Sequence, residues 1–284
     1  MIAEYLTHLE LLNSSPLTIR NYRICLSRFF QVVQKDIQDI TIDDVFQFRL
    51  YLKRNTDIGY NWREFHIIAL KSFFKWLYCR EIRCLNYEKI EINKYEEQHI
   101  EYLERYELEK MFKIKHKSPI ISARNQAMLR LFYSTGCRLA ELASINHADI
   151  APHQQLKVIG KGRKYRVVFL SNDCYKAVQD YLFLRSDNYK PLFISHGRGG
   201  NNLDHRLSHT MIDKIVRTYA RKAGLIKKVT PHILRHTFAT ELLRNGAPIM
   251  DVKDMLGHEW VTTTQIYTHV TNNYLKQAHQ SYHC

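Results

Sequence analysis

Six residues from position 138 onward have side chains that could act together on a phosphate group: Arg138, Lys161, His232, Arg235, His258 and Tyr267. A tyrosine hydroxyl can serve as a covalent nucleophile, but it is weak at its ordinary pKa of about 10 and needs an activated electrophile. Two guanidinium groups and an ammonium group suit a phosphate, because the transition state of phosphoryl transfer spreads negative charge over the non-bridging oxygens. The set therefore indicates covalent chemistry on a phosphodiester.

The positive charge of the chain is concentrated in the segment that carries these residues. The net charge of the 284 residues is +14. Residues 1–98 hold 14 basic and 13 acidic side chains, whereas residues 99–284 hold 28 basic and 15 acidic ones, a net charge of +13. A strongly basic domain commonly binds a polyanion, most often nucleic acid, although a basic surface can also serve solubility alone. The charge distribution favours a nucleic-acid partner.

The composition argues against several other classes of protein. No apolar stretch reaches the roughly 18 residues of a membrane span, and residues 1–12 hold two glutamates and no basic leader. We therefore expect a cytoplasmic, nucleoid-associated protein with no membrane partner. The six cysteines form no C-x-x-C pair, which favours reduced thiols over disulfides or a zinc site. His232 and His236 have the spacing of a helical metal pair, but they lack an intervening glutamate and a third ligand.

Four helical segments are expected in the N-terminal third of the chain. The first is formed by residues 1–12, and the second begins at Ser15 and Pro16, which are typical of a helix N-terminus. The third begins at Thr41 or Asp43, and the fourth runs from about residue 60 to residue 78, with apolar residues at helical spacing. These segments predict a compact four-helix domain. Basic residues lie between the apolar positions and face either DNA phosphates or solvent: Arg20, Arg23, Arg63, Lys71 and Lys75.

The helical periodicity is lost over residues 81–100, where the chain becomes charged. We expect residues 1–85 to form the first domain, 86–100 a linker and 101–284 the second domain. The second domain is expected to be mostly helical, with one β interruption. Residues 155–170 contain two β-branched runs around a Gly-Lys-Gly turn, which predicts an antiparallel hairpin with a basic tip. The predicted fold class is mainly α, with a small antiparallel sheet in an α+β second domain.

Two of the four blocks that contain the six residues precede position 165. In STGCRLAEL, Gly136 ends one helical pattern and Arg138 enters the next. Glu141, one turn later, is expected to support this turn rather than to react. In GKGRK, Lys161 lies at the predicted hairpin tip, from which a lysine can reach a groove or donate a proton to a leaving oxygen. Each block is weak by itself, because surface arginines and basic hairpin tips are common.

The other two blocks are more specific. In TPHILRHTFATELL, Thr and Pro start a helix on which His232 and Arg235 share one face at i, i+3 spacing. In LGHEWVTTTQIYTHV, Gly257 ends a helix and His258 follows directly. The threonine run then starts a short helix that carries Tyr267, nine residues after His258. The position of this tyrosine after a Gly-His helix end distinguishes it from the other seventeen tyrosines of the chain.

Together these blocks resemble the tyrosine recombinase/integrase family, in its Xer-like branch. The motifs T-G-x-R-x-x-E-L, G-K-G-x-K, H-x-L-R-H-x-x-A-T, L-G-H and I-Y-x-H occur in the family's order across residues 134–270. The resemblance implies that the N-terminal helices form a core-binding, SAM-like domain and that the second domain is catalytic. It also implies that the two domains form a C-shaped clamp on DNA.

The resemblance further implies a role for each residue that would contact the scissile phosphate. Arg138 and Arg235 would clamp this phosphate and stabilise its pentacoordinate transition state. Lys161 would be the general acid that protonates the departing 5′ oxygen, and His258 would hydrogen-bond the phosphate. These cations would supply the charge that metal ions supply in other nucleases, so that no metal is expected.

The nucleophile implied by the resemblance is Tyr267. Its attack would give a 3′-phosphotyrosyl link and a free 5′ hydroxyl, with His232 assisting as acid or base. A 5′ hydroxyl from a partner strand would then reverse the reaction and rejoin the DNA. Because the bond energy is kept in the phosphotyrosine, no ATP and no other cofactor are expected.

The expected activity is site-specific recombination through a Holliday junction, serving dimer or cointegrate resolution or integration of a mobile element. The expected partners are a double-stranded recombination site, with two protomers per site, and a homo-tetramer in the synaptic complex. Residues 271–284 form a tail that either docks on a neighbouring protomer or frays. Two alternatives remain open: a type IB topoisomerase that relaxes DNA without exchanging partners, and a DNA-binding protein that has lost catalysis.

Overall fold

The chain divides into two compact units, Met1–Gln98 and His99–Cys284, in the computed structural model. Each unit has a hydrophobic core of its own. No helix in the described part of the chain is long and apolar enough to cross a membrane. The structure describes residues 1–93, 101–151, 154–160, 165–196, 205–257 and 264.

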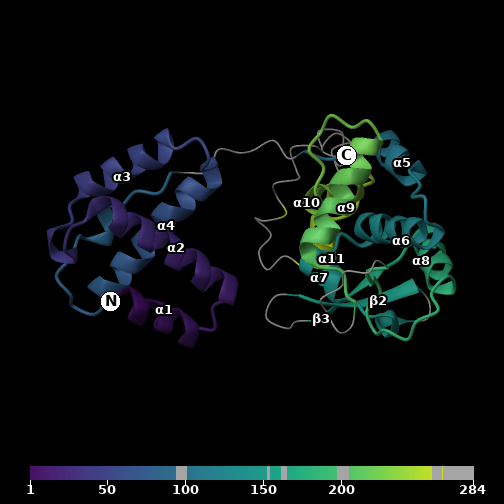
Figure 1. Ribbon diagram of the computed structural model, residues 1–284, viewed down its shortest axis with the longest axis horizontal. Helices are drawn as coiled ribbons and strands as arrows, with labels where there is room; N and C mark the ends of the chain where they lie inside the picture. The colour runs from purple at the N-terminus through teal and green to yellow at the C-terminus, as the bar shows by residue number, and fades with distance from the viewer. Residues whose placement is uncertain (94–100, 152–153, 161–164, 197–204, 258–263, 265–284) are drawn as a thin grey trace, which may run out of the picture. The chain divides into compact units, whose positions relative to one another are not determined.

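The predicted four-helix organisation of the first unit is confirmed. Its helices are α1 (Ile2–Leu11), α2 (Pro16–Val33), α3 (Ile42–Arg54) and α4 (Tyr60–Tyr78), and α2 packs against the other three (Figure 1). The Ser15 side chain caps α2 by accepting a hydrogen bond from the backbone N–H of Thr18 at 3.0 Å. Thr41, rather than Asp43, is the N-cap of α3, where it forms a capping box with Asp44.

The core of the first unit is rich in aromatic rings and includes part of the expected linker. Phe29 and Phe48 are buried and meet edge to face, with ring centroids 5.0 Å apart. Ile90, within the expected linker, is fully buried in the same core. Its carbonyl accepts a hydrogen bond from Nζ of Lys71 at 2.8 Å. Residues up to at least Ile90 are therefore packed on this unit.

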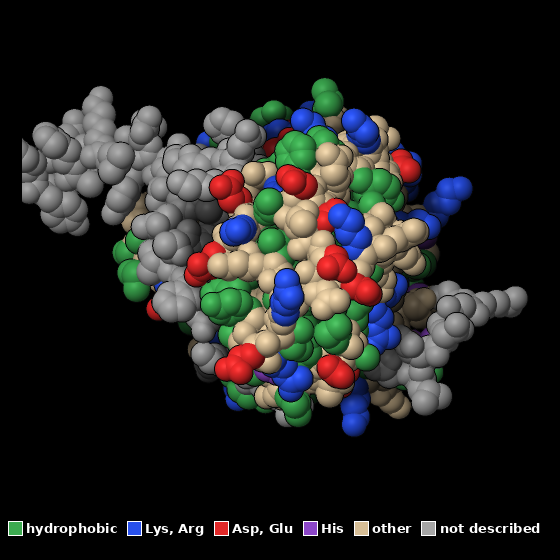
Figure 2. Space-filling model, turned by 90° about the vertical axis from the view of Figure 1, so that its left-hand side faces the viewer, with side chains coloured by type: hydrophobic (Ala, Val, Ile, Leu, Met, Phe, Trp, Pro, Cys, Tyr) green, Lys and Arg blue, Asp and Glu red, His purple; other side chains and the backbone are tan. Residues whose placement is uncertain are grey.

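The basic residues of the first unit do not form one uniform surface. Arg63 donates hydrogen bonds to the carbonyls of Ile58 and Asn55, so this side chain, like that of Lys71, serves its own unit. Figure 2 shows one face on which Lys and Arg side chains are interspersed with Asp and Glu. This mixture agrees with the near-zero net charge of residues 1–98.

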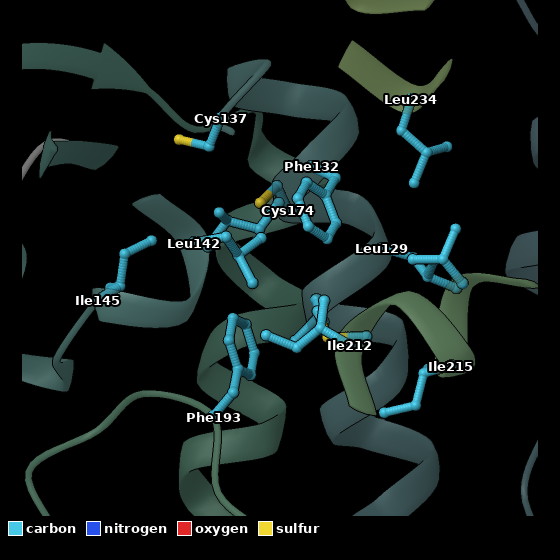
Figure 3. Packing of buried hydrophobic residues seen from close by; sticks show 14 of the residues in the cluster. Leu129, Phe132, Cys137, Leu142, Ile145, Cys174, Phe193, Ile212, Ile215 and Leu234 are labelled. Atoms are coloured by element: carbon cyan, nitrogen blue, oxygen red, sulfur yellow. The ribbon is translucent and has the colours of Figure 1, made fainter. Parts of the chain in front are cut away.

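The second unit is mostly helical and carries a small sheet, as predicted. The helices are α5 (Arg105–Lys113), α6 (Pro119–Thr135), α7 (Leu139–Ser144), α8 (Asn172–Phe183), α9 (His209–Lys222), α10 (Pro231–Arg244) and α11 (Ile249–Leu256). A hydrophobic cluster lies among them, and Figure 3 shows Phe132 of α6, Leu142 of α7 and Cys174 of α8 in this cluster. α6 packs against α8 and α10, which places it at the centre of this unit.

The sheet contains the predicted hairpin and one additional strand. β2 (Gln155–Ile159) and β3 (Tyr165–Phe169) pair antiparallel, and β1 (Ile150–Ala151) pairs with β2 on its other side. β1 was not predicted because two residues carry no readable periodicity. Val168 is buried, and the alternation of β3 places Arg166 on the same, inward side.

Gly136 ends α6 in a left-handed conformation, with φ of 58°. A Cβ atom at this position would lie 2.4 Å from Cδ1 of Phe238 on α10. Both the backbone conformation and the contact with α10 therefore require glycine. The close approach lets the chain turn from α6 into α7 directly against α10.

Gly136→Ala should destabilise the second unit by about 2–4 kcal/mol, because left-handed strain of about 1–2 kcal/mol adds to an overpacking cost of similar size. Gly224→Ala is the matched control, since Gly224 has φ of 72° but no atom within 4 Å of the added Cβ. Thermal and urea unfolding of the full chain will measure both. Equal losses in the two variants would show that the contact with Phe238 is not limiting.

Candidate active site

Arg138 occupies the N-cap position of α7 and links this helix to the end of α11. Its backbone N–H donates to Oε2 of Glu141 at 2.7 Å, and its Nη1 donates to Oε1 of the same residue at 2.9 Å. Its Nη2 donates to the carbonyl of Gly257 at 3.0 Å. The side chain remains 34% exposed, so it is held in place and still accessible to a ligand.

Glu141 is a buried carboxylate bound by two arginines. Arg166 donates from Nη1 to Oε1 and from Nη2 to Oε2, each at 2.8 Å, in the two-pronged geometry that guanidinium and carboxylate groups favour. Burial would raise the pKa of Glu141, but the bonds from Arg166 and Arg138 outweigh burial and lower this pKa to about 2. The carboxylate is therefore ionised at every pH at which the protein is expected to work. Its supporting role agrees with the expectation from the sequence.

Arg166 is a residue of the site that sequence reasoning missed. It lies on β3, and besides Glu141 it contacts the carbonyl of Met255, to which its Nε donates at 3.0 Å. The signal in the sequence was an arginine in the inward phase of a strand, on the same side as Val168. A charge in such a position needs a partner.

Arg235 lies on α10, and only 3% of its surface is exposed. Thr230 caps this helix and Pro231 is its first residue, as the sequence predicted. Nη1 of Arg235 donates to the carbonyl of Gly136 at 2.6 Å, and Nη2 donates to the carbonyl of Leu256 at 2.7 Å. The guanidinium group is thereby fixed between the ends of α6 and α11.

Three arginines meet at the C-terminal end of α11. The carbonyls of three successive residues, Met255, Leu256 and Gly257, accept hydrogen bonds from Arg166, Arg235 and Arg138 respectively. The last carbonyls of a helix have no partner within the helix, and that end carries a partial negative charge. The helix end is thus both hydrogen-bonded and electrostatically matched by the three cations. It brings the guanidinium groups of Arg138 and Arg235 next to each other.

The two histidines of α10 are both shifted toward the neutral form. Desolvation by the surrounding protein, together with Arg235 and Arg138, lowers the pKa of His232, although this side chain reaches the surface. Burial, His232 and Arg235 lower the pKa of His236 to about 4. Near pH 7 both rings are therefore mainly neutral, and His232 can accept a proton.

Of the six residues selected from the sequence, the structure brings together Arg138, His232 and Arg235. Lys161, His258 and Tyr267 lie outside the described residues, so their placement stays a prediction. Two neighbours in the chain bear on them. Lys161 belongs to the connection between β2 and β3, and His258 directly follows Gly257, whose carbonyl binds Arg138.

The described part of the site is suited to a phosphate. Two adjacent guanidinium groups can bind the non-bridging oxygens of one phosphate, and a neutral imidazole lies on the same helix as one of them. Within the described ranges, no group of three or more His, Cys, Asp or Glu residues is arranged to hold a metal ion.

Comparison with known protein families covers both units. Residues 101–273 match the Phage integrase family, and residues 2–81 match the N-terminal SAM-like domain of phage integrases. The crystal structure of XerA recombinase superimposes with a TM-score of 0.55 at 29% identity, covering 100% of this chain and 98% of that one. A XerH site-specific recombinase bound to its difH substrate has a TM-score of 0.74 at 23% identity, covering 94% and 80%. The predicted fold class is confirmed.

Named relatives match over almost the whole chain. Tyrosine recombinase XerD of Oceanobacillus iheyensis is 33% identical, covering 94% of this chain and 92% of the relative. Tyrosine recombinase XerA of Pyrococcus horikoshii is also 33% identical, covering 98% and 92%. The chain therefore belongs to the Xer-like tyrosine recombinases of the phage integrase family, and it is a tyrosine-type site-specific recombinase that breaks and rejoins DNA.

Proposed function

We propose that Tyr267 attacks a scissile phosphate that Arg138 and Arg235 hold. The observation that carries this proposal is the position of the two guanidinium groups on consecutive carbonyls, at the last residue of α11 and its capping glycine. The next residue is His258, and Tyr267 follows nine positions later. A phosphate on the two arginines would thus lie beside the start of the segment that carries the nucleophile.

The cleavage step forms one bond and breaks one. Oη of Tyr267 bonds to phosphorus while the bond from phosphorus to the 5′ oxygen breaks, which leaves a 3′-phosphotyrosine. His232, which its lowered pKa keeps neutral and able to accept, takes the phenolic proton, and Lys161 gives a proton to the departing 5′ oxygen. The two arginines and His258 stabilise the charge on the non-bridging oxygens.

Rejoining reverses the same step with the 5′ hydroxyl of a partner strand, through a Holliday junction. We propose a duplex recombination site in cytoplasmic DNA as the substrate, clamped by the two units of each protomer. Two protomers would bind each site, and four would form the synaptic complex. Solved structures of a XerH recombinase with difH and of a lambda integrase dimer with a COC′ core site support DNA as the partner. The phosphotyrosine conserves the bond energy, so ATP is not required.

A nicked suicide duplex tests this mechanism, because loss of the short fragment with the 5′ hydroxyl traps the covalent adduct. The duplex carries a site selected from random sequences by binding to this chain. We expect wild type and Tyr282→Phe, the matched control, to form an adduct visible in a denaturing gel, and Tyr267→Phe to form none. No adduct with wild type, or an adduct with Tyr267→Phe, contradicts the proposal. Wild type that forms this adduct but exchanges no strands between two intact sites would instead indicate a topoisomerase.

We also propose that the tail 271–284 docks on a neighbouring protomer and couples the active sites, with Tyr274, Leu275 and Ala278 on its contact face. Deleting 272–284 should abolish strand exchange between two sites and change DNA affinity by no more than about threefold, because the tail adds assembly contacts rather than DNA contacts. Deleting only 281–284 is the control and should retain exchange. Gel-shift and exchange assays measure both properties, and normal exchange by the longer deletion would rule docking out.

A further inference from the structure

Arg166 joins three elements of the second unit, although none of the four motif blocks contains it. It lies on β3, it binds Glu141 of α7 through both Nη atoms, and it binds Met255 of α11 through Nε. Only 12% of its side chain is exposed. Burial disfavours its charge, yet the pairing with Glu141 raises the pKa of Arg166 above its usual value. The side chain is therefore a fixed cation in the interior of the site.

The contacts of Arg166 close a ring that includes Arg138. The ring runs from Arg138 to Glu141, from Glu141 to Arg166, from Arg166 to Met255 and along the chain to Gly257, which accepts from Arg138. A Cβ atom on Gly257 would lie 3.2 Å from Cδ and Nη1 of Arg166, so the arginine also packs against the residue that caps α11. Removing Arg166 would open this ring at two of its links.

Arg166 also determines the net charge of the group of side chains around Arg138. Arg138, Arg166 and Glu141 together carry a net charge of +1, whereas Arg138 and Glu141 alone would carry zero. Without Arg166, the buried carboxylate would have one arginine left as its charged partner. A phosphate would then have to compete with Glu141 for the guanidinium of Arg138.

We infer that Arg166 is a positioning residue of DNA cleavage. It pairs with the carboxylate of Glu141 and binds the end of α11, and thereby keeps the guanidinium of Arg138 oriented toward the scissile phosphate and its charge available there. Arg166 does not itself touch the phosphate in this role. The inference rests on the proposed function, because it assigns Arg166 an effect on the step in which Tyr267 attacks.

The test measures two quantities, the first-order rate of adduct formation at saturating protein and the DNA affinity. Both are compared among wild type, Arg166→Gln, Glu141→Gln and the double variant. We expect Arg166→Gln to slow adduct formation on the order of 100-fold, with DNA affinity within about threefold of wild type. The double variant should be at least about threefold faster than Arg166→Gln, because it lacks the carboxylate that would compete with the phosphate for Arg138. Arg185→Gln is the control, since Arg185 is also a buried arginine paired with an acid, Asp187, and lies outside the site. Its rate should stay within about twofold of wild type.

The outcomes separate the inference from the proposed function. If wild type forms no adduct, the proposed function fails. Two results with an active wild type would overturn this inference alone. One is a rate of adduct formation for Arg166→Gln within about twofold of wild type. The other is a rate for the double variant that is reduced by the product of the fold-reductions in the two single variants. Thermal unfolding identifies a variant that does not fold. In that case Arg166→Lys, which keeps the charge but cannot hold Glu141 and Met255 together, should show an intermediate rate, and a wild-type rate would overturn the inference.

Discussion

The arrangement of the site depends on one buried carboxylate, that of Glu141. Burying a charge is unfavourable unless it is paired and hydrogen-bonded, and here both oxygens accept N–H donors from Arg138 and Arg166. Because the carboxylate is ionised and its geometry is fixed, the two guanidinium groups that bind it have little freedom. Each of them also reaches a carbonyl at the end of α11. The carboxylate thus orients Arg138, which is proposed to bind the phosphate, and Arg166, which is proposed to position Arg138.

The end of α11 is the second part of this arrangement. A helix C-terminus attracts cations, and three arginines from α7, β3 and α10 meet on three successive carbonyls. The elements that carry these arginines are distant in sequence, so the site forms only when the second unit has folded. The chain then continues from this helix end into His258 and the segment that carries Tyr267. A single helix terminus therefore connects the proposed phosphate clamp to the proposed nucleophile.

Much of the fold and part of the site could be predicted from local sequence. Helix boundaries at Ser15, Gly136, Thr230 and Gly257 follow from capping chemistry within a few residues, and the structure has them at those positions. Strand alternation places Arg166 on the inward side of β3, but local sequence does not identify the groups that it binds. Its partners, Glu141 and Met255, lie 25 and 89 positions away, and no local periodicity encodes such contacts. The burial of Ile90 in the first unit is likewise a tertiary fact, since its neighbours along the chain are charged.

A crystal structure of the Tyr267→Phe variant bound to its duplex site tests the phosphate clamp of Arg138 and Arg235 most directly. We expect nitrogen atoms of Arg138 and Arg235 to lie about 3 Å from non-bridging oxygens of the scissile phosphate. Both side chains should keep their bonds to the carbonyls of Gly257 and Leu256. A scissile phosphate bound elsewhere, or arginines that leave the end of α11 when DNA binds, would contradict this proposal.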